Sequence, residues 1–103
     1  MTEKLINRQL LESLANKLEE AGFEVSRYFI SDCWFIRIYL RKKYIRTVDT
    51  EEYIAIIIDD ELRIKLSQGI GLGIWTFENL GDFNAFCWDL IKALQIIREY
   101  IKT

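Results

Sequence analysis

The residues best suited to chemistry are basic and aromatic, and they are concentrated between positions 27 and 46. That stretch holds six Lys or Arg residues and one acid, Asp32, so its net charge is +5. On a strand over residues 33–41, alternate side chains point away from the core. Guanidinium groups bind phosphates while aromatic rings stack on bases. The pattern therefore predicts one candidate nucleic-acid surface, made of Arg37, Tyr39, Arg41, Lys42, Lys43 and Arg46.

A structural interpretation accounts for the same residues. Edge strands and hairpin ends collect Lys and Arg, which block edge-to-edge aggregation. Six acids follow in residues 49–61 with no basic residue among them, and they can pair with the preceding cations. The whole chain has 14 Lys and Arg against 16 Asp and Glu, a net charge of −2. Overall negative charge favours the structural interpretation over nucleic-acid binding.

Several classes of catalytic chemistry are excluded by the absence of histidine from the 103 residues. Without imidazole, Ser-His and Cys-His pairs and most zinc sites cannot form. Cys33 and Cys87 lie among apolar residues, so buried free thiols are predicted, with a disulfide as the less favoured alternative. Asp59, Asp60 and Glu61 could attract a hard cation, but their spacing fits no calcium-binding loop and acids are common in turns. No cofactor or metal is expected, and a non-enzymatic role is favoured.

The elements that must position these residues follow from hydrophobic periodicity. Gly22 is the predicted end of an amphipathic helix. Asp59, Asp60 and Glu61 are the predicted turn of a hairpin that sets Ile56 opposite Ile64. The expected elements are a helix over 2–21, strands within 23–30, 33–41, 44–48, 52–58, 62–67 and 69–77, and a helix over 82–102 capped by Asp82. We therefore predict a single α+β domain over residues 1–103, a two-layer sandwich with an antiparallel sheet of about five strands.

Some apolar residues exceed what such a sandwich can hide. Trp88 lies about 140° around the last helix from its core stripe, because successive residues turn by about 100°. Exposed apolar patches usually mark association. We expect an interface that includes Trp88, Ile96, Phe35 and Tyr53, and hence a homodimer that also binds a macromolecular partner.

A family resemblance gives a further alternative. The run LLESLANKLEEAGFEVSR followed by EYIAIIIDDELRIKLS resembles the helix and hairpin that open nuclease domains of the archaeal Holliday-junction-resolvase and restriction-endonuclease type. The resemblance implies a metal-binding acid on the first hairpin strand, at the position of Glu52, and a Glu-x-Lys triplet on the second. The triplet's place reads Lys65-Leu66-Ser67, so one carboxylate needed for metal-assisted cleavage is missing.

Three functions follow in order of preference: a non-catalytic interaction protein, a nucleic-acid-binding protein, and a degenerate or metal-dependent nuclease-like domain. No apolar run approaches the ~20 residues of a membrane span, so no membrane association is expected and a cytoplasmic, intracellular location is predicted.

Overall fold

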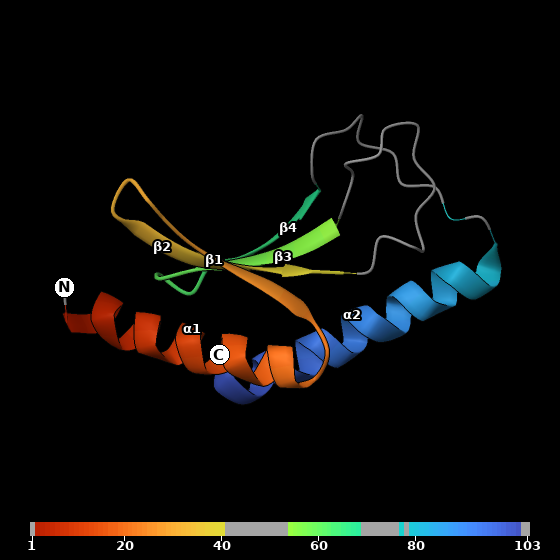
Figure 1. The fold of residues 1–103 in the computed structure, drawn as a ribbon, viewed down its shortest axis with the longest axis horizontal. Helices are drawn as coiled ribbons and strands as arrows, with labels where there is room; N and C mark the ends of the chain where they lie inside the picture. The colour runs from red at the N-terminus through yellow and green to blue at the C-terminus, as the bar shows by residue number, and fades with distance from the viewer. Residues whose placement is uncertain (1, 41–53, 69–76, 78, 102–103) are drawn as a thin grey trace.

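The computed structural model describes residues 2–40, 54–68, 77 and 79–101. Its strands form an antiparallel meander with both helices below one face of the sheet (Figure 1). This confirms the α+β prediction, although the described part has four strands rather than about five. The predicted strand 44–48 lies outside the described residues, as does all of 69–77 except Phe77. The elements are α1 (Thr2–Glu20), β1 (Glu24–Ile30), β2 (Cys33–Tyr39), β3 (Ile54–Asp59), β4 (Ile64–Gln68) and α2 (Leu80–Tyr100).

The core lies between the sheet and the helices. Ile36 and Ile38 of β2 pair with Ile58 and Ile56 of β3, and all four side chains are almost completely buried. Because side chains alternate across a strand, these residues share the face that α1 covers with its own buried leucines. Those leucines are Leu11, Leu14 and Leu18.

α1 ends where the sequence predicts, at Gly22. The Gly22 amide donates to Glu19 O and the Phe23 amide to Leu18 O, both at 3.0 Å. Gly22 has φ +99°, a left-handed conformation that only glycine adopts without strain. The start of α1 differs from expectation, because Ile6 belongs to the predicted apolar side yet is 59% exposed.

The turns set the register of the sheet. Ser31 and Asp32 both have positive φ and form the predicted turn between β1 and β2. The β3–β4 register was predicted wrongly by two residues, because Ile56 lies opposite Leu66 rather than Ile64. Asp59 extends β3, and its Oδ1 accepts hydrogen bonds from the amides of Glu61 and Arg63, both at 3.0 Å. The turn therefore holds residues 60–62 instead of 59–61.

A buried carboxylate attaches the first turns of α1 to the sheet. Oδ2 of Asp60, a side chain only 1% exposed, accepts from Arg8 Nε at 2.9 Å and from the Trp34 amide at 3.1 Å. Asn7 Nδ2 donates to the Asp60 carbonyl at 2.9 Å. Burial raises the pKa of Asp60, but the bonds from Trp34 and Arg8 outweigh it and the net pKa lies below its ordinary value.

A second polar cluster attaches the later part of α1 to β1. Arg27 donates from Nε to both carboxylate oxygens of Glu12, at 2.9 and 3.0 Å, and from Nη2 to Glu19 at 2.8 Å. Nη2 also donates to Asn16 Oδ1 at 3.0 Å. The basic side chain at position 27 is thus committed to the α1–β1 contact, and its partners are acids of α1 rather than the acids of residues 49–61 named in the structural interpretation.

Candidate interaction surface

α2 begins earlier than the sequence predicts. Asn79 is the N-cap, and its Oδ1 accepts from the Asp82 amide at 2.8 Å, so Asp82 is a first-turn residue rather than the cap. The residues of α2 that are buried are Phe86, Ala93 and Ile97. Phe86 packs with Leu40 and Ile54, and the other two join the main core. The buried side of α2 is therefore narrower than the predicted stripe, which also contained Phe83 and Leu94.

Five other large apolar side chains of α2 are exposed to solvent. Trp88 is 70% exposed and Leu80 71%. The exposed set, called here the α2 apolar surface, consists of Leu80, Phe83, Trp88, Ile91 and Leu94. Successive helical residues turn by about 100°, so these five occupy an arc of roughly 140° beside the buried stripe. With roughly 200 Å² for a fully exposed large side chain, their exposed fractions amount to about 500 Å².

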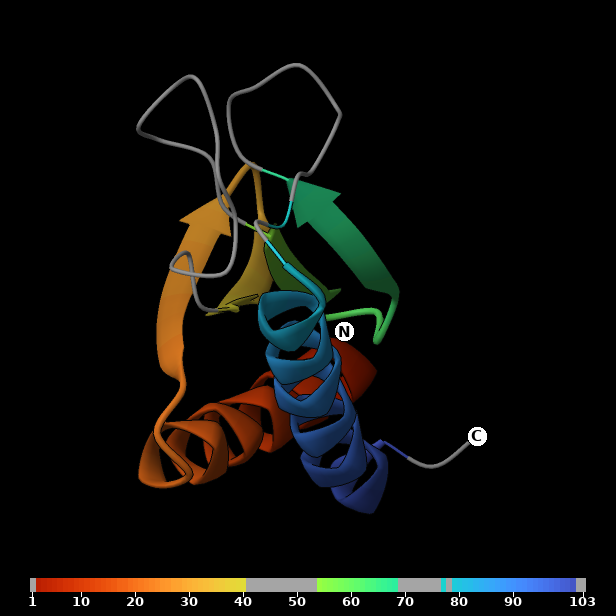
Figure 2. The same ribbon diagram turned by 90° about the vertical axis from the view of Figure 1, so that its right-hand side faces the viewer.

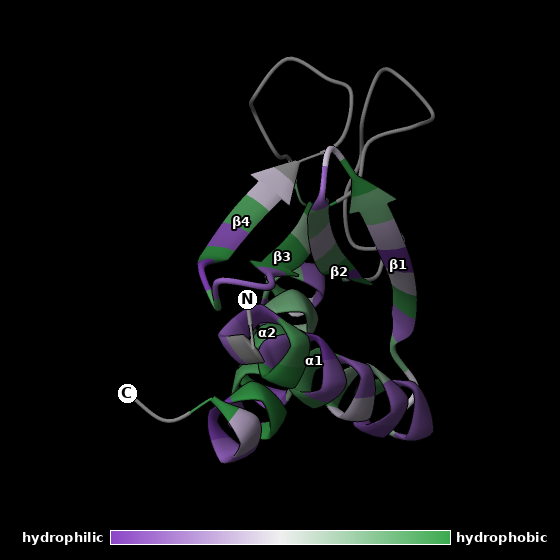
Figure 3. Cartoon of the chain, turned by 90° about the vertical axis from the view of Figure 1, so that its left-hand side faces the viewer, coloured by the Kyte–Doolittle hydropathy of each residue, from purple (hydrophilic) through white to green (hydrophobic). Residues whose placement is uncertain are grey.

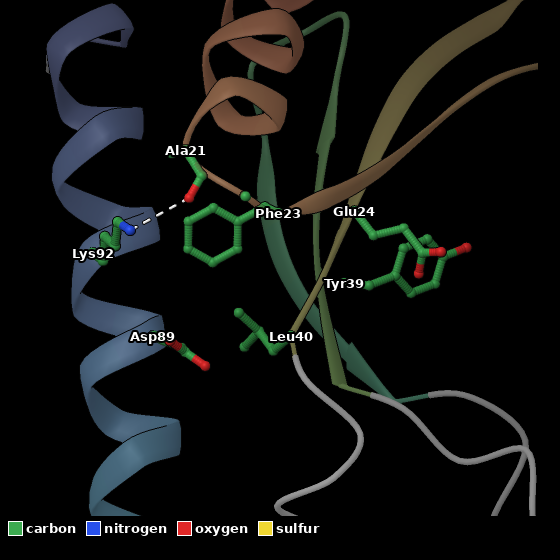
Figure 4. Close-up of a pocket in the computed structure, with 8 residues that line it drawn as sticks. Ala21, Phe23, Glu24, Tyr39, Leu40, Asp89 and Lys92 are labelled. Carbon is green, nitrogen blue, oxygen red and sulfur yellow. Dashed lines mark hydrogen bonds between the residues drawn. The ribbon is translucent and has the colours of Figure 1, made fainter.

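Contacts on the polar side of α2 fix which way this surface points. Lys92 and Asp89 line a cleft of about 340 Å³ with the end of α1 and the start of β1 (Figure 4). Lys92 Nζ donates to Ala21 O at 3.3 Å and lies 5.9 Å from the Phe23 ring centroid. Around the helix, Leu80, Phe83, Ile91 and Leu94 lie about 130–170° from the midpoint of Lys92 and Asp89, whereas Trp88, four residues before Lys92, lies only about 70° from it. Since β1 and β4 lie on opposite sides of α2 (Figure 2), those four residues face the β4 side, and Trp88, about 160° from the buried stripe, points away from the core.

β4 is also uncovered on that side. Ile64 and Leu66 pair with Ile58 and Ile56 and so point toward the helix layer, yet they are 48% and 54% exposed. Among the described elements, α1 packs on β1, β2 and α2, and the extensive contacts of β4 are with β3. Figure 3 shows the hydrophobic segments of β4 alternating with polar ones at the edge of the sheet. Two apolar surfaces, one on β4 and one on α2, thus share one side of the molecule.

The opposite face of the sheet holds the described members of the predicted nucleic-acid surface. Tyr28 stacks on Phe35 at 5.1 Å between centroids, and the Arg37 guanidinium lies 4.9 Å from the Tyr28 centroid. The Tyr39 and Tyr28 hydroxyls are 3.1 Å apart. Burial raises the pKa of Tyr39, but hydrogen bonds involving Ser26, Tyr28 and Arg37 lower it overall. The aromatic rings and the Arg37 guanidinium on this face therefore contact one another.

Several predicted site residues lie elsewhere or outside the described part. Ile96 is half-buried against the main core, so it does not belong to the α2 apolar surface. Phe35 is half-buried on the outer face and lies apart from Trp88. Nucleic-acid binding stays a prediction, because four of its six residues are outside the described ranges. The residues outside are Arg41, Lys42, Lys43, Arg46 and the predicted interface residue Tyr53.

The acids of the β3–β4 turn are engaged by the chain itself. Oδ2 of Asp59 accepts from Arg63 Nε at 2.9 Å. Burial raises the pKa of Asp59, and the Arg63 and Glu61 bonds lower it to a net value below the ordinary one. Within residues 2–40, 54–68, 77 and 79–101, no three His, Cys, Asp or Glu residues are grouped as metal ligands. Glu52, the acid implied by the nuclease resemblance, is outside these ranges.

Other sequence predictions can be checked in the same ranges. Cys33 and Cys87 are free thiols, as predicted, but they are half-buried rather than buried. None of the described helices is long and apolar enough to cross a membrane. Comparisons with protein-family models, curated proteins and solved structures found no match. Functional inference therefore rests on the surfaces of the molecule.

Proposed function

We propose that the protein is a non-catalytic interaction protein that associates with itself through the α2 apolar surface and, as an assembly, binds a macromolecular partner. The observation that supports this most directly is the exposure of Trp88, at 70%, together with four other large apolar side chains on one side of one helix. Apolar patches on monomeric proteins are usually about 300–600 Å² at most, and the largest are often functional. The α2 apolar surface alone is at the upper part of that range.

Self-association is preferred over a ligand site because of the surface's shape and chemistry. It is convex, it belongs to a single helix, and it carries no buried polar group that would orient a small molecule. Burying apolar area at about 25 cal/mol per Å² provides a driving force without any specific chemistry. Homodimers with two-fold symmetry are the commonest soluble assemblies.

Light scattering during size-exclusion chromatography tests the proposal. The wild-type chain should elute as a dimer whose fraction falls on dilution, and an Ile91→Glu variant should be a folded monomer, because a carboxylate cannot be buried there without a partner. Ser13→Glu adds the same charge to an exposed position of α1 and should leave the dimer intact. A wild-type chain that stays monomeric at its highest soluble concentration would refute self-association, as would an Ile91→Glu variant that dimerises normally.

A further inference from the structure

Besides its side chains, β4 presents backbone groups that pair with no other strand of the described sheet. The Asp59 amide donates to Arg63 O at 3.2 Å, so these two opposite residues form a hydrogen-bonded pair of the β3–β4 ladder. In an antiparallel ladder such pairs alternate with non-hydrogen-bonded ones. Lys65 and Ser67 therefore direct their backbone groups toward β3, whereas the amides and carbonyls of Ile64, Leu66 and Gln68 point away from the sheet. Among the described residues, nothing pairs with them.

The outward backbone groups and the uncovered side chains belong to the same residues. Ile64 and Leu66 have their polar groups at the edge and their apolar side chains, 48% and 54% exposed, on the helix side. Exposed strand edges are templates for a further strand, and proteins normally shield them. From these coincident features we infer that the edge of β4 is a strand-pairing site for the β4 strand of a second copy, and that it forms part of the proposed homodimer interface.

Charge selects one register for this pairing. Residues whose backbone groups point out of the sheet must lie opposite residues of the same kind in the second copy. If Ile64 lies opposite Leu66 of the second copy, Lys65 lies opposite Lys65 of that copy. If Ile64 lies opposite Ile64 of the second copy, Arg63 lies opposite Lys65 of that copy. Like charges directly opposite are destabilising. Centring the pair on Leu66 avoids both contacts, because Lys65 then faces Ser67, and it engages every residue of β4, whose range is Ile64–Gln68.

The exposed apolar area favours a dimer interface that includes the β4 edge over one formed by the α2 apolar surface alone. A standard-size interface buries roughly 600–1,000 Å² from each partner. The α2 apolar surface offers about 500 Å², and the exposed fractions of Ile64 and Leu66 add about 200 Å² at roughly 200 Å² per side chain, so only the two surfaces together reach that range. A two-fold axis perpendicular to the sheet keeps the helices of both copies on one face. The two β4 strands then lie side by side between the two α2 apolar surfaces.

Cysteine cross-linking tests the register directly. In a background with Cys33→Ala and Cys87→Ala, a Leu66→Cys variant places two thiols on opposite residues whose Cα atoms are about 5.5 Å apart, within disulfide range. Ile64→Cys is the matched control: position 64 pairs with position 68, so the Cα atoms of the two introduced cysteines are separated by roughly 14 Å along the strands. On mild oxidation, Leu66→Cys should form a covalent dimer at least about tenfold faster than Ile64→Cys.

A backbone variant gives an independent result. Leu66→Pro removes an amide that points out of the sheet, and proline is tolerated in edge strands at such positions. It should therefore leave circular dichroism unchanged and abolish the dimer, whereas Leu66→Ala should only weaken it. If Leu66→Pro unfolds the chain, the cross-linking result still decides.

The inference rests on the proposed self-association, but the two fail differently. A dimer in light scattering that is disrupted by Ile91→Glu, with no preference for cross-linking at position 66, overturns edge pairing and leaves the α2 proposal standing. If cross-linking is selective for position 66 and the Ile91→Glu variant still dimerises, the results support pairing through the β4 edge and overturn self-association through the α2 apolar surface. A strict monomer overturns both. A β4 edge that pairs only with a peptide of another protein also overturns the inference.

Discussion

Replacement of Asp60 tests whether this one carboxylate attaches α1 to the sheet. Asp60→Ala leaves two donors, the Trp34 amide and Arg8 Nε, without the acceptor that they share. A hydrogen bond to a charged group contributes about 1.5–3 kcal/mol. The Arg8 side chain is 24% exposed and can be partly rehydrated, so its bond is taken at the lower end. The expected loss in the free energy of unfolding is about 3 kcal/mol.

Asp60→Asn should cost about half as much. Its carbonyl oxygen can occupy the Oδ2 position and keep both donors, while the new amide group lies toward Cys33, whose Sγ is 3.9 Å from Oδ1. Only the charge is lost, and charge-assisted bonds are roughly twice as strong as neutral ones. We expect a loss of about 1.5 kcal/mol.

Urea unfolding followed by tryptophan fluorescence and circular dichroism measures these losses. All variants must be compared at one protein concentration, because self-association adds to apparent stability by mass action. Glu61→Gln is the control: its carboxylate is 52% exposed, and its effect should stay within about 0.5 kcal/mol. A loss below about 1 kcal/mol in Asp60→Ala, or equal losses in the Ala and Asn variants, would show that the shared acceptor is not what holds α1 to the sheet.

Three further predictions concern pH, salt and nucleic acid. The pKa values of Asp59 and Asp60 are lower in the folded state than in the unfolded state. The stability that these two carboxylates contribute is therefore fully present above the unfolded pKa of about 3.9, and it is lost as the pH falls through the folded pKa values. The melting temperature should fall below about pH 4, and it should fall less steeply in Asp60→Asn. Arg27→Gln should lower the free energy of unfolding by about 1 kcal/mol in low salt, and a difference independent of salt would contradict an ion-pair origin. If the basic segment binds duplex DNA, the salt slope of log K should become shallower by about 0.9 for each phosphate that a variant no longer neutralises, and unchanged affinity and slope in the triple alanine variant of Arg41, Lys42 and Lys43 would contradict that function.

Local signals in the sequence predicted the helices and the alternation of the strands. Gly22 ends α1 because its positive φ is a property of one residue and needs no distant contact. Ile36 and Ile38 are buried because alternation in β2 places them on one face, and Leu40, one residue beyond β2, is buried as well. The register of β3 and β4 was not predictable in this way. The register depends on whether Asp59 is a strand residue or a turn residue. The hydrogen bonds that the amides of Glu61 and Arg63 donate to the Asp59 carboxylate place it in the strand.

The roles of Asp60 and α2 depend on contacts that sequence spacing does not contain. An acid in a turn is ordinarily exposed, and Asp60 is buried because Arg8, 52 residues earlier, reaches it. α2 is apolar over two adjacent sides, so periodicity alone could not decide which side faces the core. The structure buries Phe86, Ala93 and Ile97 and leaves Phe83 and Leu94 exposed.

Exposure on the β4 side follows from how the helix layer is built. An α-helix is about 10 Å wide and strands are about 4.8 Å apart, so two helices lying parallel could cover four strands. Here α1 packs on β1, β2 and α2, and within the described ranges the extensive contacts of β4 are with β3, while Ile64 and Leu66 are about half exposed. Yet Ile64 and Leu66 alternate with Arg63, Lys65 and Ser67 as a strand with one buried face does. The mismatch between that pattern and the described helix layer is the physical reason to expect a second chain at this side.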